Sequence, residues 1–149
     1  MGQDITKQKK IEFYTQNCIP SFFREIAKKC PNSSALIYDG QHMSYKELDE
    51  KSDILAHWLI KRGIQKEDFV ALCLDRSFEM IISIFGILKA GGAYVPIDVD
   101  YPEERLEFML KDAQAKVVLT QKNLTPRIPK SNTTVLCLDE DWRKLEEEF

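Results

Sequence analysis

The stretch from Leu88 to Asp98, with the sequence LKAGGAYVPID, specifies how the middle of this chain folds. It begins at the end of the segment 78–88, whose hydrophobic residues would occupy nearly every face of a helix. Two adjacent glycines, Gly91 and Gly92, then precede a short run of strand-forming residues. Glycine after the last turn of a helix adopts the left-handed conformation that ends it. The stretch therefore predicts an apolar helix covered by protein on most sides, a sharp turn and a strand.

Strand-like runs and helical patterns alternate after residue 68. A continuous apolar run of strand length covers 69–74, and further strands are expected at 94–97, 116–120 and 133–138. Pro96 marks a strand end or an unpaired edge position, and a helix is expected to start at 100–103 with Pro102 in its first turn. Strands that alternate with helices predict a parallel sheet with right-handed crossovers. The fold class is therefore α/β, with a weak helical pattern in the charged segment 141–149.

A small hairpin is expected earlier in the chain. The Asp39-Gly40 pair tolerates the positive φ angles of a type I′ turn, so 35–38 and 41–43 should pair as antiparallel strands. Before the hairpin, apolar residues recur at helical spacing over 19–29, which predicts a helix.

A longer helix should follow the hairpin. Ser44 and Glu47 form a capping box that starts it, and Gly63 stands near its end. Its apolar face comprises Leu48, Ser52, Leu55, Ala56 and Leu59, and its opposite, solvated face comprises Lys46, Glu50, Asp53, His57 and Lys61. We interpret His57 as a solvated surface histidine with no chemical role.

Composition bounds the class of protein. The 149 residues are 44% hydrophobic and 30% charged, which is ordinary for one compact domain or part of a larger one. A net charge of -3 gives no reason to expect nucleic acid or an anionic membrane as a partner. No apolar run approaches the length of a membrane span, and no signal peptide is expected. We expect residues 1–16 to form a polar N-terminal segment and 17–149 to form the domain portion.

The cysteines indicate neither a metal site nor a disulfide framework. Cys18, Cys30, Cys73 and Cys137 are scattered without a CxxC pair, and Cys73 and Cys137 stand inside apolar strand-like runs. Buried thiols behave as small hydrophobic groups. The pattern predicts a reduced, cytoplasmic protein.

The glycines between 86 and 92 do not form a phosphate-binding loop. Phosphate binds at helix N-termini, where free amide protons and the positive end of the helix dipole point outward. Gly91 and Gly92 are instead expected at the C-terminal end of a helix, and Gly86 is expected to permit close helix packing. No Gly-x-x-x-x-Gly-Lys-Ser/Thr sequence occurs.

Other charged residues are weaker candidates for chemistry. Asp98 and Asp100 form an acidic pair, but one of them is more simply a helix cap. Arg76 lies in Asp75-Arg76-Ser77, directly after an expected strand, where open α/β sheets bind ligands. A structural ion pair is the simpler interpretation of Arg76, and Ser77 or Asp75 can cap the next helix.

Several motifs together resemble the adenylation domains of nonribosomal peptide synthetases, which belong to the adenylate-forming AMP-dependent synthetase/ligase superfamily. The segment 43–48, MSYKEL, is similar to the first core motif of that family, and 88–98 is similar to the second. Similar segments also occur at 63–70 and 101–106, so the resemblance extends from about Ile19 to Leu124. AYVPID, at 93–98, is fairly specific to the amino-acid-activating branch.

The resemblance implies the N-terminal portion of the large subdomain and an ATP-dependent aminoacyl-adenylating activity in the biosynthesis of secondary metabolites. ATP and Mg would serve the complete enzyme, and a phosphopantetheine carrier protein would accept the product. The motifs present are mainly structural, and none of those that bind ATP or catalyse the reaction is found here. We therefore expect no catalytic, cofactor-binding or metal-binding residue in this chain, which would act as scaffold.

Three accounts of such a chain are open. It is a fragment of a longer gene or an excised piece, which we favour; one half of a split adenylation enzyme; or a non-catalytic protein-interaction module derived from one. The partners expected from the first two are the remainder of the adenylation domain and a carrier protein. The activated amino acid is not specified by these residues.

Overall fold

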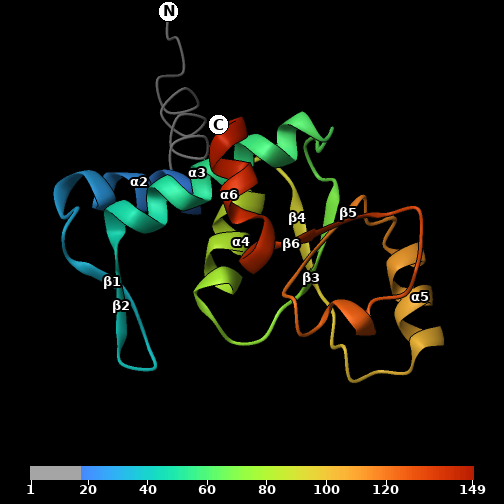
Figure 1. The fold of residues 1–149 in the computed structure, drawn as a ribbon. Helices are drawn as coiled ribbons and strands as arrows, with labels where there is room; N and C mark the ends of the chain where they lie inside the picture. The colour runs from blue at the N-terminus through green and yellow to red at the C-terminus, as the bar shows by residue number, and fades with distance from the viewer. Residues whose placement is uncertain (1–17) are drawn as a thin grey trace, which may run out of the picture.

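A computed structural model describes residues 18–149 (Figure 1). The expected polar segment 1–16 lies outside the described residues. The elements are, in order, α2 (Ile19–Lys29), β1 (Ser34–Tyr38), β2 (Gln41–Ser44), α3 (Tyr45–Lys61), β3 (Phe69–Cys73), α4 (Phe78–Lys89), β4 (Ala93–Pro96), α5 (Glu103–Asp112), β5 (Val117–Thr120), the 3₁₀ turn η1 (Thr125–Arg127), β6 (Thr134–Cys137) and α6 (Leu138–Glu148).

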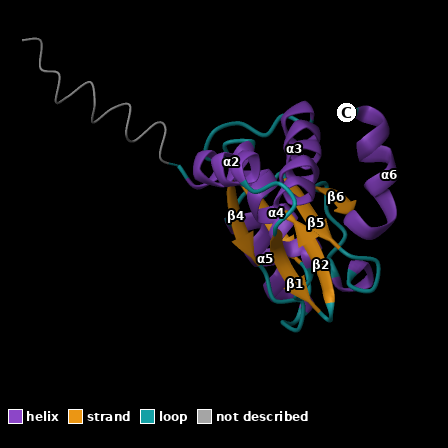
Figure 2. Ribbon diagram, turned by 90° about the vertical axis from the view of Figure 1, so that its left-hand side faces the viewer, coloured by secondary structure: helices purple, strands orange, loops and turns teal. Residues whose placement is uncertain are grey.

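The predicted α/β architecture is confirmed. Four parallel strands form one sheet in the order β4-β3-β5-β6, and β1 and β2 form a separate antiparallel hairpin. Helices α3, α4 and α6 cover one face of the sheet and α5 lies on the other (Figure 1). Helix α2 packs outside α3 and α4, and the hairpin extends from this side of the molecule (Figures 1 and 2).

Successive residues of β3 and β5 point to opposite faces of the sheet, which is why the chain has two cores. Val70 and Leu72 join the large core under α3 and α4, whereas Ala71 and Cys73 join a smaller core under α5. Both faces are covered, so β3 is apolar without interruption, as the sequence indicates.

The hairpin and the capping box form as predicted. Asp39 and Gly40 have φ angles of 49° and 72°, the left-handed pair that a type I′ turn requires. The Ser44 hydroxyl accepts a hydrogen bond from the Glu47 amide at 3.1 Å, and the Glu47 carboxylate accepts one from the Ser44 amide at 2.8 Å. Helix α3 ends at Lys61, two residues before Gly63.

Two helix starts differ from the predictions. Pro102 is the N-cap of α5 and does not lie in its first turn, because its extended backbone precedes the helical residues. Helix α6 begins at Leu138, directly after β6, so the prediction that placed Leu138 in a strand is wrong. Leu138 and Leu145 of α6 are buried against the large core. This packing explains why the helix starts before the segment 141–149, in which the sequence shows only a weak helical pattern.

The solvated face predicted for α3 is partly wrong. The His57 ring is half-buried and lies edge-on to the ring of Phe149, with centroids 5.4 Å apart. Asp53 belongs to an ion-pair network between helices. The apolar face also includes Trp58, which is 5% exposed. Helices α2 and α6 cover parts of α3 that an isolated amphipathic helix would present to water.

Helix α4 packs closely on α3 at Gly86. A Cβ atom built on Gly86 would lie 2.8 Å from Cδ2 of the fully buried Leu55, so only glycine allows this approach. The predicted packing role of Gly86 is therefore confirmed. Ile82, Ser83, Gly86 and Ile87 are the buried residues of α4, and the others, including Ile81, Ile84 and Phe85, are only half-buried. One side of this apolar helix thus has incomplete cover.

No helix within residues 18–149 is both long enough and apolar enough to pass through a membrane.

Candidate functional site

The glycine turn after α4 uses its amide protons internally. The Gly92 amide donates to the Ile87 carbonyl at 3.0 Å and the Gly91 amide donates to the Leu88 carbonyl at 3.1 Å. This is the Schellman pattern, and Gly91 has the positive φ, 84°, that the pattern needs. A Cβ atom on Gly92 would lie 3.1 Å from the Asp68 carbonyl oxygen. The structural interpretation of these glycines is confirmed, since neither amide is available to a phosphate.

The acidic pair forms a local turn. Asp98 accepts a hydrogen bond from the Asp100 amide at 2.9 Å. Neither carboxylate caps α5, contrary to the helix-cap interpretation, because Pro102 occupies the N-cap position and no side chain caps it. Asp100 is 85% exposed and lies 3.9 Å from Arg127, which also donates to the Val99 carbonyl at 2.8 Å. The two carboxylates therefore do not face each other across a cleft as an acid–base pair would.

The loops at the carboxyl ends of β3 and β5 bind each other. Gln121 accepts a hydrogen bond from the Asp75 amide at 3.0 Å, and Asn123 donates to the Asp75 carboxylate at 3.2 Å. Of the two cap candidates, Ser77 is the one that caps α4, and it accepts from the Met80 amide. Arg76 is exposed and has no ion pair with any residue of 18–149, so the structural ion pair expected for it is absent there.

Gln121 and Asn123 were missed by sequence reasoning. The signal that could have identified them is their place directly after a strand of the same parallel sheet, since such strands end at one edge. Asp139, which follows the neighbouring strand β6, lies at the same edge of the sheet. Its carboxylate accepts a hydrogen bond from the Lys122 amide at 2.9 Å and one from the Cys137 thiol at 3.1 Å. Burial opposes the charge on Asp139, but these hydrogen bonds hold its pKa below the ordinary value.

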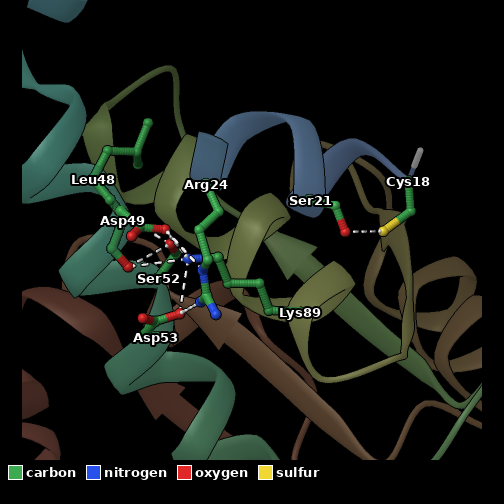
Figure 3. A network of polar contacts seen from close by, with 8 residues as sticks. All are labelled: Cys18, Ser21, Arg24, Leu48, Asp49, Ser52, Asp53 and Lys89. Carbon is green, nitrogen blue, oxygen red and sulfur yellow. Dashed lines mark hydrogen bonds and ion pairs between the residues drawn. The ribbon is translucent and has the colours of Figure 1, made fainter. Parts of the chain in front are cut away.

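A second polar cluster joins α2, α3 and α4 (Figure 3). The Lys89 ammonium, on a side chain only 6% exposed, lies 2.7 Å from the Asp49 carboxylate and 2.8 Å from that of Asp53. It also donates to the Asp49 carbonyl at 3.0 Å. Arg24 of α2 pairs with the same Asp53 carboxylate. Every charge in the cluster is matched by an opposite one, so the arrangement fixes helices together and leaves no group poised for catalysis.

The thiols divide into buried and exposed pairs, as predicted. Cys73 and Cys137 are 2% and 8% exposed, and Cys18 and Cys30 are exposed. Burial raises the pKa of both Cys73 and Cys137 to about 11, with the Asp139 hydrogen bond adding to the effect at Cys137. Hydrogen bonds from Ser21 lower the pKa of Cys18.

No group of three His, Cys, Asp or Glu side chains in the described part of the chain is arranged to hold a metal ion.

Two of the four cysteines should therefore react quickly with a thiol reagent and two slowly. At about pH 8 in native buffer, a bulky disulfide reagent should label Cys18 and Cys30, with Cys18 faster, because the thiolate is the reactive form. Cys73 and Cys137 should react only after denaturation. Mass spectrometry of the labelled peptides measures this, and fast native labelling of Cys73 would contradict the buried placement of β3.

Comparisons with known proteins give the family. The model of the AMP-binding enzyme family matches residues 23–149. The chain belongs to the AMP-binding enzyme family. A subunit of the linear gramicidin synthase of Brevibacillus parabrevis is 47% identical over 131 residues, which is 88% of this chain and 2% of that protein. Polyketide synthase PksN of Bacillus subtilis strain 168 is 51% identical over 111 residues, or 74% of this chain and 2% of that protein.

Solved structures agree with this assignment. The nonribosomal peptide synthetase FmoA3 matches with a TM-score of 0.79 and 33% identity, covering 83% of this chain and 13% of its own. The N-terminal subdomain of Klebsiella oxytoca NpsA, in complex with 3-hydroxyanthranilyl-AMSN, has a TM-score of 0.72 and 29% identity, covering 87% and 32%. The predicted resemblance to nonribosomal peptide synthetase adenylation domains is confirmed. This chain spans about 2% of the length of the curated relatives described above.

Proposed function

We propose that this chain supplies the N-terminal scaffold of an amino-acid-activating adenylation domain in nonribosomal peptide synthesis. The observation that carries the proposal is the match to FmoA3 over 83% of this chain at 33% identity, which joins fold and sequence evidence. In the activity proposed, the carboxylate of an amino acid attacks the α-phosphate of ATP. An aminoacyl-adenylate forms and pyrophosphate leaves.

The comparisons support the nucleotide and the acceptor of this reaction. FmoA3 has been solved with AMPPNP bound and with α-methyl-L-serine-AMP bound. NpsA-ThdA is an artificially fused adenylation–PCP di-domain. We propose by analogy that the complete enzyme uses ATP, with Mg as the counter-ion of its phosphates, and passes the aminoacyl group to a carrier-protein thiol. The four free cysteines support a reducing compartment such as the cytoplasm.

The role of this chain in that enzyme is structural. The motif at 88–98 joins the apolar helix α4 to the edge strand β4, and its amides complete the Schellman turn. The polar side chains at the carboxyl ends of β3 and β5 bind one another. We therefore assign no catalytic, ATP-binding or metal-binding residue to this chain, and we place those functions in polypeptide outside it.

The isolated chain should neither bind Mg-ATP nor catalyse amino-acid-dependent pyrophosphate exchange. A chimera tests the proposed activity: this chain replaces the matching region of the adenylation domain in the linear gramicidin synthase of Brevibacillus parabrevis. The chimera should support pyrophosphate exchange, while the same protein without the matching region should not. Calorimetry with Mg-ATP and isotope exchange are the measurements.

Three results would count against the proposal. Saturable micromolar binding of Mg-ATP by the isolated chain would contradict the scaffold role. A soluble chimera without exchange activity would contradict the adenylation function. A monodisperse, cooperatively melting isolated chain that gains nothing from the rest of the domain would favour the protein-interaction alternative.

A further inference from the structure

The guanidinium of Arg76 has no partner within residues 18–149. Of the six arginines in the sequence, Arg24, Arg62, Arg127 and Arg143 form ion pairs, and Arg105 lies over the ring of Tyr101. Arg76 is exposed, and its side chain forms no ion pair, hydrogen bond or ring contact in this part of the chain. A guanidinium presents five donors in a fixed fork that fits the oxygens of a phosphate or a carboxylate. Arg76 is therefore free to bind an anionic group.

The backbone on both sides of Arg76 is fixed. On one side, the Asp75 amide donates to the Gln121 side chain at 3.0 Å, and the Asp75 carboxylate accepts from Asn123 at 3.2 Å. On the other side, the Ser77 hydroxyl donates to the Asp75 carbonyl at 2.9 Å and caps α4. These contacts hold the loop and do not use the guanidinium. Because the loop is already ordered, binding through Arg76 costs less entropy.

The path of the chain makes this edge of the sheet a place for ligand binding. After β3 the chain passes to α4 and then to β4, on one side of β3. After β5 it passes through η1 to β6 on the other side, and Ile128, next to η1, packs in the smaller core. The adjacent strands β3 and β5 therefore send the chain in opposite directions. Open α/β sheets bind ligands outside the carboxyl ends of strands at such a point.

The charges at this edge limit which anion can bind. The first four residues after each strand carry six carboxylates, Asp75, Asp98, Asp100, Asp139, Glu140 and Asp141, and two cations, Arg76 and Lys122. Lys122 pairs with Glu140 at 2.9 Å. Repulsion from the carboxylates opposes a triphosphate with several negative charges, whereas a group with one negative charge can be bound by one arginine. The edge therefore suits a monoanion better than ATP.

The proposed reaction offers two monoanions. The carboxylate of the amino acid must meet the α-phosphate of ATP, so these two groups share one site. The other monoanion is the phosphodiester that joins the phosphopantetheine arm to its carrier protein. The thiol end of the arm enters the site of reaction, while the phosphodiester stays at the surface beside the carrier. An exposed arginine on a fixed loop suits this end of the arm.

We propose that Arg76 binds the phosphodiester of the phosphopantetheine arm when the carrier protein delivers its thiol. This inference rests on the proposed function and deepens it, because it names a contact for the acceptor on this chain. The thiol sulfur attacks the carbonyl carbon of the aminoacyl-adenylate, the thioester bond forms, AMP leaves and the thiol proton passes to water. Arg76 takes no part in bond making. Its contact lowers the KM for the carrier protein.

The two half-reactions of the gramicidin synthase chimera test this contact. Arg76→Gln should raise the KM for a phosphopantetheinylated carrier protein in aminoacyl transfer by about tenfold, the loss expected for one hydrogen bond to a charged group. The KM values for ATP and for the amino acid in pyrophosphate exchange should not change. Arg76→Lys should restore part of the loss, because it keeps the charge without the fork.

Arg143→Gln is the matched control. Arg143 is exposed on α6 and its ion pair is with Glu147, one turn along the same helix, at 3.3 Å. Its replacement should leave the KM for the carrier protein unchanged.

Calorimetry separates the arm from the carrier protein itself. The chimera should bind the carrier with the arm more tightly than the carrier without it, and Arg76→Gln should remove about tenfold of the affinity for the first and none for the second. Equal weakening for both forms would show that Arg76 binds carboxylates of the carrier, and would overturn the inference.

The remaining outcomes also decide the matter. A raised KM for ATP or the amino acid would place Arg76 at the adenylation site, and unchanged kinetics in Arg76→Gln would leave it without a role in transfer; either result overturns the inference. A lowered urea midpoint of the Arg76→Gln chimera would show an internal ion pair and also overturns it. A chimera without pyrophosphate exchange contradicts the proposed activity, but selective loss of binding to the carrier with its arm still supports the contact.

Discussion

Lys89→Met is expected to lower the free energy of unfolding by about 2–4 kcal/mol. The lysine side chain is 6% exposed and lies between the carboxylates of Asp49 and Asp53, so its removal leaves two partly buried negative charges with Arg24 as their remaining partner. Loss of one partner from a fully buried pair costs about 3–5 kcal/mol, and the partial exposure of Asp53 reduces this figure through solvent screening. The loss is a large part of the ~5–15 kcal/mol stability of a typical domain.

Urea denaturation followed by circular dichroism measures the change. Lys46→Met is the matched control, because Lys46 pairs with Glu50 on α3 but both side chains are 62% exposed. Its expected cost is below about 0.5 kcal/mol, as for an exposed i,i+4 pair. Equal shifts in the two variants would show that the Lys89 cluster does not fix α4 to α3.

Gly86→Val is expected to destabilise the fold by about 3 kcal/mol, at the upper end of overpacking effects. A Cβ atom at this position lies 2.8 Å from Cδ2, 2.9 Å from Cγ and 3.1 Å from Cβ of Leu55. Leu55 is fully buried, so it has no open space to move into. The helices must separate, and the packing at Ile82 and Ile87 on the same face of α4 is lost with them.

A double-mutant cycle identifies Leu55 as the cause. Leu55→Ala alone should cost about 2–5 kcal/mol through the cavity that it leaves. In that background, Gly86→Val should cost at least about 1 kcal/mol less than in the parent, because the conflicting side-chain atoms are gone. Additive free energies in thermal or urea unfolding would show that the close approach of α3 and α4 does not limit this position.

The local structure of this chain could largely be predicted from its sequence. Hydrophobic spacing indicated the helices, and the uninterrupted apolar run at 69–74 indicated a strand covered on both faces. The Asp39-Gly40 and Ser44–Glu47 pairs predicted a turn and a cap with defined backbone geometry. These features depend on a few neighbouring residues. The sequence also shows that Gly91 and Gly92 follow the C-terminal end of a helix. Residues at that position lie beside free carbonyl groups, which do not bind a phosphate.

The polar sites could not be predicted in the same way. The residues that bind Asp75 are 46 and 48 positions away in sequence, and they meet it only because β3 and β5 are neighbours in the sheet. Arg76, with a similar local sequence position, has no such partner among residues 18–149. Strand order is a property of the assembled sheet, so residue spacing alone does not predict these pairs.

The fold class, the hairpin, the helix cap, the turn at Gly91 and the family resemblance follow from the amino-acid sequence, because each depends on short-range geometry or on contiguous motifs. Tertiary packing was needed to show that Asp53 joins Lys89 and Arg24 and that Phe22 stays exposed while Phe23 is buried. An amphipathic pattern specifies which side of a helix is apolar. How much of that side is covered depends on the helices packed around it, and on α2 those helices cover Phe23 and leave Ile19, Phe22 and Ile26 open.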